Sequence, residues 1–206
     1  MTTTQPAATF TAPDKLKRCS WCASDPIYVA YHDNEWGRPV HDDNKLFEKI
    51  CLEGFQAGLS WLTILRKREN FRTAFKGFDP QVVAKFTSRD VERLMKNEGI
   101  VRNRMKIEAT IANAKATLMV QRELGSLDAL IWSFAPKKPA KMPKQFGDVP
   151  ASTPESKALS KELLKRGFKF VGPTTMYAAM QSLGLVNDHF ATCHARKTSN
   201  DKPPRA

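Results

Sequence analysis

Apolar residues recur at helical spacing along almost the whole chain, and this periodicity constrains the fold more than any other feature. Leu46, Phe47, Ile50 and Cys51 fall on one face of a helix predicted over residues 44–57. The alternating β-branched runs and hairpin turns typical of strands are missing from the sequence. The sequence therefore predicts an all-α fold.

Capping signals set the expected helix ends. Asp79 and Pro80 have the residue types of an N-cap and a first helical position, and Thr87 with Asp90 resembles a capping box. Gly99 stands where a C-terminal cap belongs. Further helices are predicted from residue 60, along 107–118, over 127–134, from 153 to 167 and over 174–183.

The length of 206 residues suits one domain between two polar tails. We expect disordered tails over residues 1–17 and 195–206, and a single all-α domain over residues 18–194. Residues 135–154 contain five prolines and four lysines and are expected to form a surface loop.

The net charge of +12 favours a polyanionic partner such as nucleic acid, although solubility alone would also explain a basic surface. No apolar stretch approaches the roughly 18 residues of a membrane span, and the N-terminus lacks the pattern of a secretion signal. The four cysteines then fit reduced thiols in a cytosol better than disulfides. They are free for metal binding or for plain burial.

Cysteines and histidines stand near both ends of the predicted domain. Cys19 and His32 are separated by twelve residues, and His189 lies one helical turn before Cys193. Two thiolates and two imidazoles make a closed tetrahedral zinc site, which leaves no position for a reacting water. Such a metal would be structural and would tie the two ends of the domain together.

The spacing leaves other arrangements open. Cys22 lies three residues after Cys19 and could form a competing ligand pair, and His194 is a second candidate beside Cys193. Buried cysteines and surface histidines without any metal are a further alternative.

Aromatic residues and one carboxylate suggest a pocket. Tyr28, Tyr31 and Trp36 fall within nine residues, as either a stacking site for a flat ligand or ordinary packing at the edge of the core. Glu53 lies at the edge of the apolar arc of its predicted helix, where a carboxylate either turns toward water or points into a pocket. After it, the helix break over 56–61 carries the apolar Leu59, which could fill the space of an extruded base.

The turn after Gly99 joins two predicted helices within a few residues. Backbone N–H groups at a helix start, together with Arg102 and Arg104, would form a phosphate site. A plain interhelical turn with exposed arginines fits the same pattern. Lys106, just beyond the turn, is expected to be a phosphate contact or a surface charge.

Several blocks in one order resemble DNA-3-methyladenine glycosylase I, a bacterial family of the helix-hairpin-helix superfamily. The resemblance extends from about Arg18 to His194. The matching blocks are residues 25–28, 31–37, 51–54, 56–61, 165–172 and 184–189.

The resemblance implies roles for individual residues. It implies a structural Zn²⁺ held by Cys19, His32, His189 and Cys193, and a base-contacting carboxylate at Glu53. It further implies base-binding aromatic residues at Tyr28, Tyr31, Trp36 and Trp61, a DNA wedge at Gly58 and Leu59, and a phosphate-binding hairpin with Gly99, Arg102 and Arg104.

The activity implied is hydrolysis of the N-glycosidic bond of 3-methyladenine in alkylated double-stranded DNA, without strand cleavage. The resemblance further implies a monomer of the bacterial cytoplasm, associated with the nucleoid, with neither a membrane nor an obligate protein partner. The alternative is a zinc-stabilised DNA-binding module without catalysis, which would need the basic hairpin but no buried carboxylate.

Overall fold

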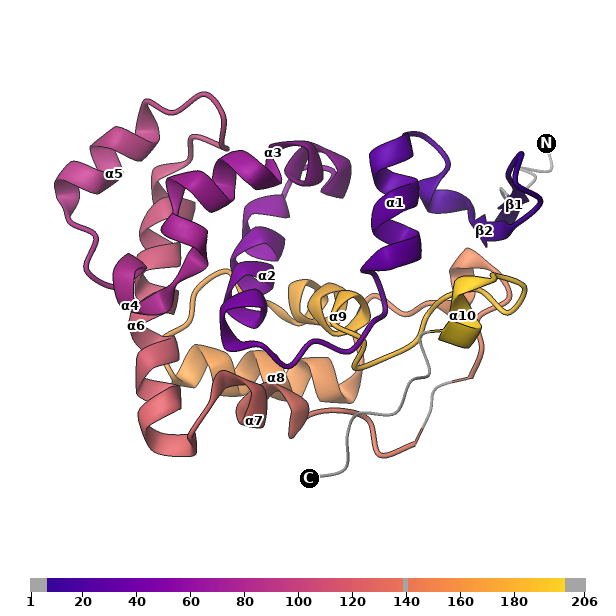
Figure 1. Cartoon of the computed structure of the whole chain (residues 1–206). Helices are drawn as coiled ribbons and strands as arrows, with labels where there is room; N and C mark the ends of the chain where they lie inside the picture. The colour runs from indigo at the N-terminus through magenta and orange to yellow at the C-terminus, as the bar shows by residue number, and fades with distance from the viewer. Residues whose placement is uncertain (1–6, 139–140, 199–206) are drawn as a thin grey trace, which may run out of the picture. The chain divides into compact units, whose positions relative to one another are not determined.

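The computed structural model describes residues 7–138 and 141–198 and is mostly helical (Figure 1). Its contacts divide the chain into two compact units, each assembled from separate stretches of sequence. One unit comprises residues 40–135 and 152–179, and is called the helical unit here. The other comprises residues 1–39, 136–151 and 180–206, and is called the terminal unit because both chain ends belong to it. The single domain predicted over 18–194 stays a prediction.

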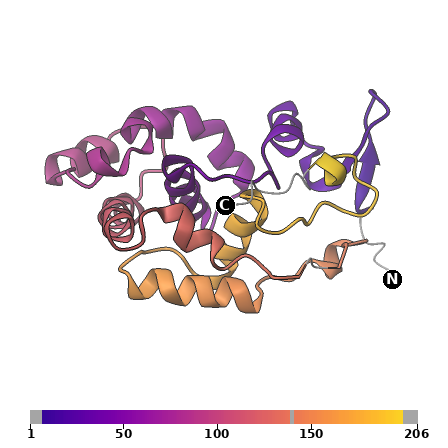
Figure 2. The same ribbon diagram turned by 60° about the horizontal axis from the view of Figure 1, so that its bottom comes forward.

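The long helix α6 (Arg104–Leu124) is the centre of the helical unit, and it contacts α2, α4, α5 and α7. Figure 2 looks nearly down its axis. The other elements of this unit are α2 (Asp43–Gln56), α3 (Trp61–Ala74), η2 (Lys76–Phe78), α4 (Pro80–Val83), α5 (Ser88–Met95), α7 (Leu127–Trp132), α8 (Pro154–Lys165) and most of α9 (Pro173–Ser182).

Buried phenylalanine rings fill the space between α2, α3 and η2. Phe55 lies 4.6 Å from Phe71 between ring centroids, and Phe75 stacks on Phe78 at 5.4 Å. Full burial of such a side chain stabilises the fold by roughly 1.5–3 kcal/mol. This packing therefore holds α2, the helix that contains Glu53, in position.

The predicted N-terminal caps are confirmed. Asp79 accepts a hydrogen bond from the backbone of Gln81 at the start of α4, and the Thr87–Asp90 capping box opens α5. The predicted C-terminal cap at Gly99 is wrong, because α5 ends at Met95 and is capped by Lys96. Gly99 serves close packing instead: a Cβ atom there would lie 2.9 Å from Cγ of Asn70.

The terminal unit corrects the all-α prediction. Strand β1 (Thr9–Thr11) pairs antiparallel with β2 (Lys17–Cys19). The first strand lies inside the predicted disordered tail over residues 1–17, and the second begins at the last residue of that tail. Contacts distant in sequence hold this hairpin, including a hydrogen bond between the hydroxyls of Thr9 and Thr192. The unit also contains η1 (Ser20–Cys22), α1 (Pro26–Asn34), η3 (Phe146–Asp148) and α10 (Ala195–Thr198).

The predicted C-terminal tail begins with α10, and its residues 199–206 lie outside the described part of the chain, as do residues 1–6 of the N-terminal tail. Within the described residues, no helix combines the length and the apolar character that crossing a membrane requires.

Gly184 offers a test of packing in the terminal unit. Its φ is +79°, and an added Cβ atom would lie 2.5 Å from the backbone of Arg38 and Pro39. Gly184→Ala should lower the free energy of unfolding by about 2 kcal/mol or more, since backbone strain and a clash combine. Gly147→Ala is the matched control, because open space surrounds that position. Equal urea midpoints for the two variants would contradict this account.

Candidate functional site

Four buried side chains of the terminal unit converge as potential metal ligands. They are Cys19 from β2, His32 from α1, and His189 and Cys193 from the segment before α10. Nδ1 of His189 lies 3.7 Å from Sγ of Cys19, 3.6 Å from Sγ of Cys193 and 3.2 Å from Nε2 of His32. Zinc bond lengths in a tetrahedron require about 3.6 Å between N and S ligands and about 3.3 Å between two N ligands. The donor set and its spacing therefore fit zinc.

Hydrogen bonds orient both histidine rings toward this cluster. Nδ1 of His32 donates to Asp33 at 2.7 Å, so its Nε2 faces the cluster. Nε2 of His189 donates to the carbonyl of Trp36 at 3.1 Å, so its Nδ1 faces the cluster. Partners of this kind fix the tautomer of a ligating histidine.

Asp33 joins several charged groups behind His32. Burial opposes its ionisation, but hydrogen bonds from Arg18, His32 and His194 lower the pKa of Asp33 to about 2. The carboxylate thus stays ionised and can support the imidazole. Sequence reasoning missed Asp33 and Arg18, although Asp33 directly follows His32 in the chain.

The alternative ligands are placed elsewhere. The thiol of Cys22 donates to the carbonyl of Cys19 at 3.1 Å, and burial raises the pKa of Cys22 to about 12. Nε2 of His194 donates to Asp33 at 3.1 Å. His194 is therefore grouped with Asp33 and His32, not with the two cysteines.

The aromatic residues predicted on and after α1 lie around a tryptophan that sequence reasoning missed. The ring of Trp21 lies 4.9 Å from Tyr28 and 5.1 Å from Trp36, and Tyr28 lies 6.4 Å from Tyr31. Trp36 also packs edge-on against His189 at 4.6 Å. The aromatic group and the Cys/His cluster therefore share contacts. A tryptophan two residues after Cys19 was the signal available in the sequence.

In the helical unit, α2 buries Glu53, which is only 5% exposed. Burial raises the pKa of Glu53 above its ordinary value, and Lys49 partly opposes this effect. The ammonium of Lys49 lies 3.2 Å from the carboxylate and 3.7 Å from the ring centroid of Trp61. Glu53 and Trp61 therefore belong to one cluster with Lys49. Sequence reasoning missed Lys49, although it lies four residues before Glu53, a spacing that places two side chains next to each other on a helix.

A tight turn follows Glu53 and connects α2 to α3. Gly58 has φ +80°, a conformation that suits glycine, and Leu59 is 42% exposed. The predicted wedge residues thus occupy a short, sharply bent segment with an exposed apolar side chain.

Lys106 holds the end of α2 beside this turn. Its ammonium donates to the carbonyls of Phe55 at 2.9 Å and Ala57 at 2.6 Å, where a positive charge stabilises a helix C-terminus. Lys106 is 8% exposed, and burial lowers the pKa of its ammonium. The prediction of a phosphate contact or a surface charge is wrong, because the side chain turns inward from α6. The cavity beside it measures about 10 Å³, far too small for a sugar.

The predicted hairpin lies between α5 and α6. Asn103 caps α6 by accepting a hydrogen bond from the backbone of Lys106, and Lys67 of α3 donates to the carbonyl of Glu98. Arg102 and Arg104 are exposed, and Arg104 pairs with Glu92 at 2.7 Å. The turn is therefore anchored, with two arginines on its surface.

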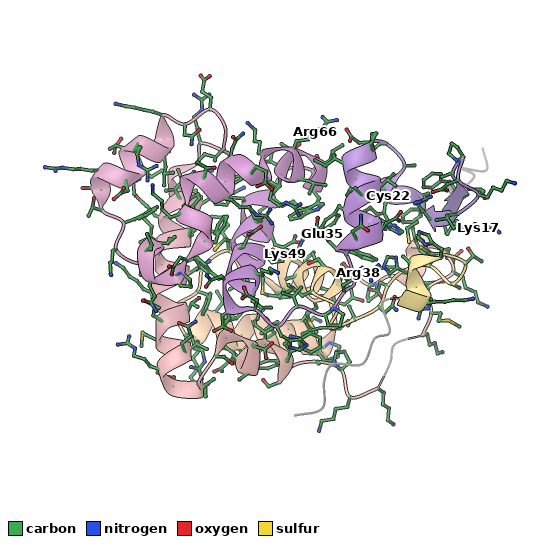
Figure 3. All side chains as sticks on the ribbon, in the orientation of Figure 1. Lys17, Cys22, Glu35, Arg38, Lys49 and Arg66 are labelled. Carbon is green, nitrogen blue, oxygen red and sulfur yellow. The ribbon has the colours of Figure 1, made fainter. Side chains whose placement is uncertain are left out.

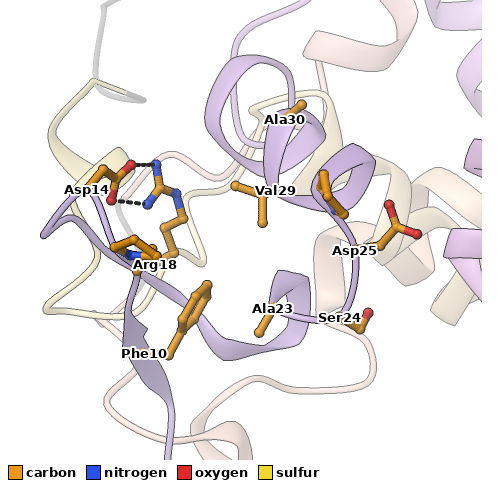
Figure 4. A pocket seen from close by; sticks show the side chains of 11 residues that line it. Phe10, Asp14, Arg18, Ala23, Ser24, Asp25, Val29 and Ala30 are labelled. Atoms are coloured by element: carbon orange, nitrogen blue, oxygen red, sulfur yellow. Dashed lines mark hydrogen bonds and ion pairs between the residues drawn. The ribbon is translucent and has the colours of Figure 1, made fainter.

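A separate pocket of about 600 Å³ lies in the terminal unit, between the β hairpin and α1 (Figure 4). Phe10 and Val29 give it an apolar wall, and the ion pair of Asp14 with Arg18 borders it. None of the predicted site residues lines this pocket.

Comparison with known proteins gives consistent matches over most of the chain. The sequence model of a family described as methyladenine glycosylase matches residues 21–197. DNA-3-methyladenine glycosylase 1 of Escherichia coli K12 is 52% identical over 179 residues, which are 86% of this chain and 96% of the relative. A crystal structure of 3-methyladenine DNA glycosylase I superposes with a TM-score of 0.83 at 53% identity, covering 86% of this chain and 98% of that one. A variant of 3-methyladenine DNA glycosylase I in complex with 3-methyladenine gives a TM-score of 0.83 at 37% identity, covering 87% and 97%.

The burial of Glu53 predicts a pH-dependent loss of stability. Because its pKa is raised in the folded state, stability falls as the pH rises from the ordinary value of 4.5 through the raised value. Glu53→Gln removes this titration, so the variant should gain stability relative to the unmodified protein across that range. Denaturant unfolding at a series of pH values measures the difference, with Glu69→Gln at an exposed carboxyl of α3 as the control. A difference that stays constant as the pH rises above 4.5 would rule out a raised pKa.

Proposed function

The chain belongs to the methyladenine glycosylase family, and we propose that it hydrolyses the N-glycosidic bond of 3-methyladenine in alkylated double-stranded DNA. Excision of the damaged base would begin base excision repair. The buried carboxylate of Glu53, close to the ring of Trp61, is the observation that carries this proposal. A desolvated anion near an aromatic face favours a flat, cationic ligand.

Hydrolysis of the N-glycosidic bond of a methylated adenine needs little acid catalysis. Methylation at N3 places a positive charge on the base, so the base is already a good leaving group. The protein has to extrude the nucleotide, hold the base and position a water molecule. We assign recognition of the cationic base to Glu53, because a carboxylate in a low-dielectric setting discriminates strongly between a charged and a neutral partner.

Stacking is assigned to the aromatic residues. Trp61 lies close to Glu53 through their shared partner Lys49. In the terminal unit, Tyr28 and Trp36 pack against Trp21, and Tyr31 lies next to Tyr28. Aromatic stacking contributes roughly 1–3 kcal/mol per base. Base-binding roles for these residues are supported by the family resemblance.

DNA contacts are assigned to the two turns of the helical unit. Leu59 on its glycine turn would fill the gap left by the extruded base, and the anchored hairpin with Gly99, Arg102 and Arg104 would hold a phosphate. The inward position of Lys106, beside a cavity of only about 10 Å³, supports an enzyme that does not cleave the strand through this lysine.

The alternative function is a DNA-binding module without catalysis. The buried carboxylate favours the enzyme, since a binder of phosphates has no use for a desolvated anion. Incubation with methylated duplex DNA and chromatography of the released bases tests the proposal. We expect release of 3-methyladenine with little 7-methylguanine. A folded, zinc-loaded protein that releases neither base would contradict the proposed activity and would favour the binding module.

We further propose that Cys19, His32, His189 and Cys193 hold one structural Zn²⁺. When bound, the metal would join segments from both ends of the chain and would supply no reacting water, because all four positions are taken. Its binding energy would contribute to folding of the terminal unit. The family resemblance also supports action as a monomer in the bacterial cytoplasm.

Metal analysis checks the zinc proposal. The purified protein should contain one zinc ion per chain, and Cys193→Ser should lose it and unfold at a lower temperature because one ligand is gone. Cys22→Ser is the matched control, since this buried thiol donates to a backbone carbonyl and should leave the zinc content unchanged. Zinc retained in Cys193→Ser, or lost in Cys22→Ser, would contradict the assigned ligand set.

A further inference from the structure

Lys49 contacts the two groups that we assign to recognition of the damaged base, the carboxylate of Glu53 and the ring of Trp61. Its ammonium lies 3.2 Å from a carboxylate oxygen of Glu53 and 3.7 Å from the ring centroid of Trp61. The Lys49 side chain is only 12% exposed and projects from α2 (Figure 3). One cation therefore neutralises the buried carboxylate and covers an aromatic face at the same time.

This arrangement follows from the local fold. Lys49 and Glu53 are one helical turn apart on α2, and the turn after α2 brings Trp61, the first residue of α3, back beside them. A lysine four residues before a glutamate is the less favourable order for a helical ion pair. The ion pair is stabilising instead because Glu53 is buried, and a buried carboxylate needs a positive partner.

A methylated adenine makes the same two demands as the lysine. It is a flat cation that gains from a carboxylate and from an aromatic face. Both cations cannot hold the same carboxylate oxygen and the same ring face at once. The lysine and the base are therefore competitors for one pair of partners.

We propose that Lys49 is a specificity-determining residue that stands in for the cationic base in the free enzyme and is displaced when that base enters. The proposal rests on the proposed function and deepens it. Displacement by a cation exchanges one positive partner of Glu53 for another, so the buried carboxylate stays compensated. A neutral adenine would leave it buried without a counter-charge, which is strongly unfavourable.

The lysine side chain suits this exchange. It is unbranched and flexible, so its ammonium can move toward water while the methylene chain keeps its packing. Displacement of the ammonium costs free energy whichever base enters. Only a cationic base compensates for this cost through its own contact with Glu53. Selectivity against undamaged adenine would thus come from the competitor as well as from the pocket.

Substitution of the lysine tests the proposal, with a matched control on the same helix. Lys49→Met keeps the length of the side chain and removes the charge, and Lys45→Met removes the same charge from an exposed position one turn earlier on α2. Both variants lose equal net charge, so general attraction to DNA falls equally. The measurements are KM and kcat for release of 3-methyladenine from duplex DNA, and the rate of release of unmodified adenine.

Relative to Lys45→Met, Lys49→Met should lower KM for the methylated substrate roughly threefold to tenfold, about the gain from one partly desolvated cation–π contact. It should also release unmodified adenine faster. A KM that rises, or that changes equally in both variants, would overturn the competitor role. A protein whose unsubstituted form releases no 3-methyladenine would defeat the proposed function itself, which separates the two failures.

A measurement on the unsubstituted protein covers the case in which Lys49→Met does not fold. Lysine ammonium groups labelled by reductive ¹³C-methylation give separate NMR signals, and ring current from Trp61 should shift that of Lys49. Addition of the 3,9-dimethyladeninium ion, which keeps the positive charge that 3-methyladenine loses on release, should return this signal toward the position of exposed lysines, and unmodified duplex DNA should not. A signal unmoved by saturating 3,9-dimethyladeninium would show that a cationic base does not displace the lysine.

Discussion

A carboxylate buried away from water needs a positively charged partner. This requirement of Glu53 constrains the residues that surround it in the helical unit. The phenylalanine core fixes α2, and α2 carries Glu53 into the interior. Lys49 from the preceding turn of the same helix supplies the charge, and Trp61 from the next helix supplies an aromatic face over that charge. Lys106 binds the carbonyls at the end of α2 and so holds both Glu53 and the Gly58–Leu59 turn in place.

The terminal unit depends on a second constraint, the convergence of two buried cysteines and two buried histidines from distant parts of the sequence. Each histidine is held by a hydrogen bond on its far side, one to Asp33 and one to the carbonyl of Trp36. The second bond connects the cluster to the aromatic group, because Trp36 also packs on Trp21. Stability at the cluster and the shape of the aromatic group are therefore coupled, so loss of a ligand should disturb both.

Local signals in the sequence predicted much of the fold. The caps at Asp79 and Thr87, and the helices α2 and α8, depend on neighbouring residues and were predictable from them. The strand pair over residues 9–19 was not, because three-residue strands have no periodicity to detect and are held by contacts with residues far along the chain. The predicted C-terminal cap at Gly99 was wrong for a similar reason. This glycine is needed for close packing against Asn70, a residue distant in sequence.

The candidate site shows the same division. The four candidate metal ligands could be proposed from residue types, but only the fold separates them from Cys22 and His194. Glu53 was recognisable at the edge of an apolar arc. The inward turn of Lys106 was not recognisable, because its partners are backbone carbonyls, which the sequence does not distinguish.

We propose that Glu53 recognises the positive charge of the damaged base. The most direct test compares Glu53→Gln with the unsubstituted protein in two assays, single-turnover release of 3-methyladenine and equilibrium binding to duplex DNA. We expect release to fall by roughly 10²–10³-fold, as for loss of one electrostatic contact in a site without water, while DNA binding is retained. Equal losses in both assays, or unchanged release, would contradict it.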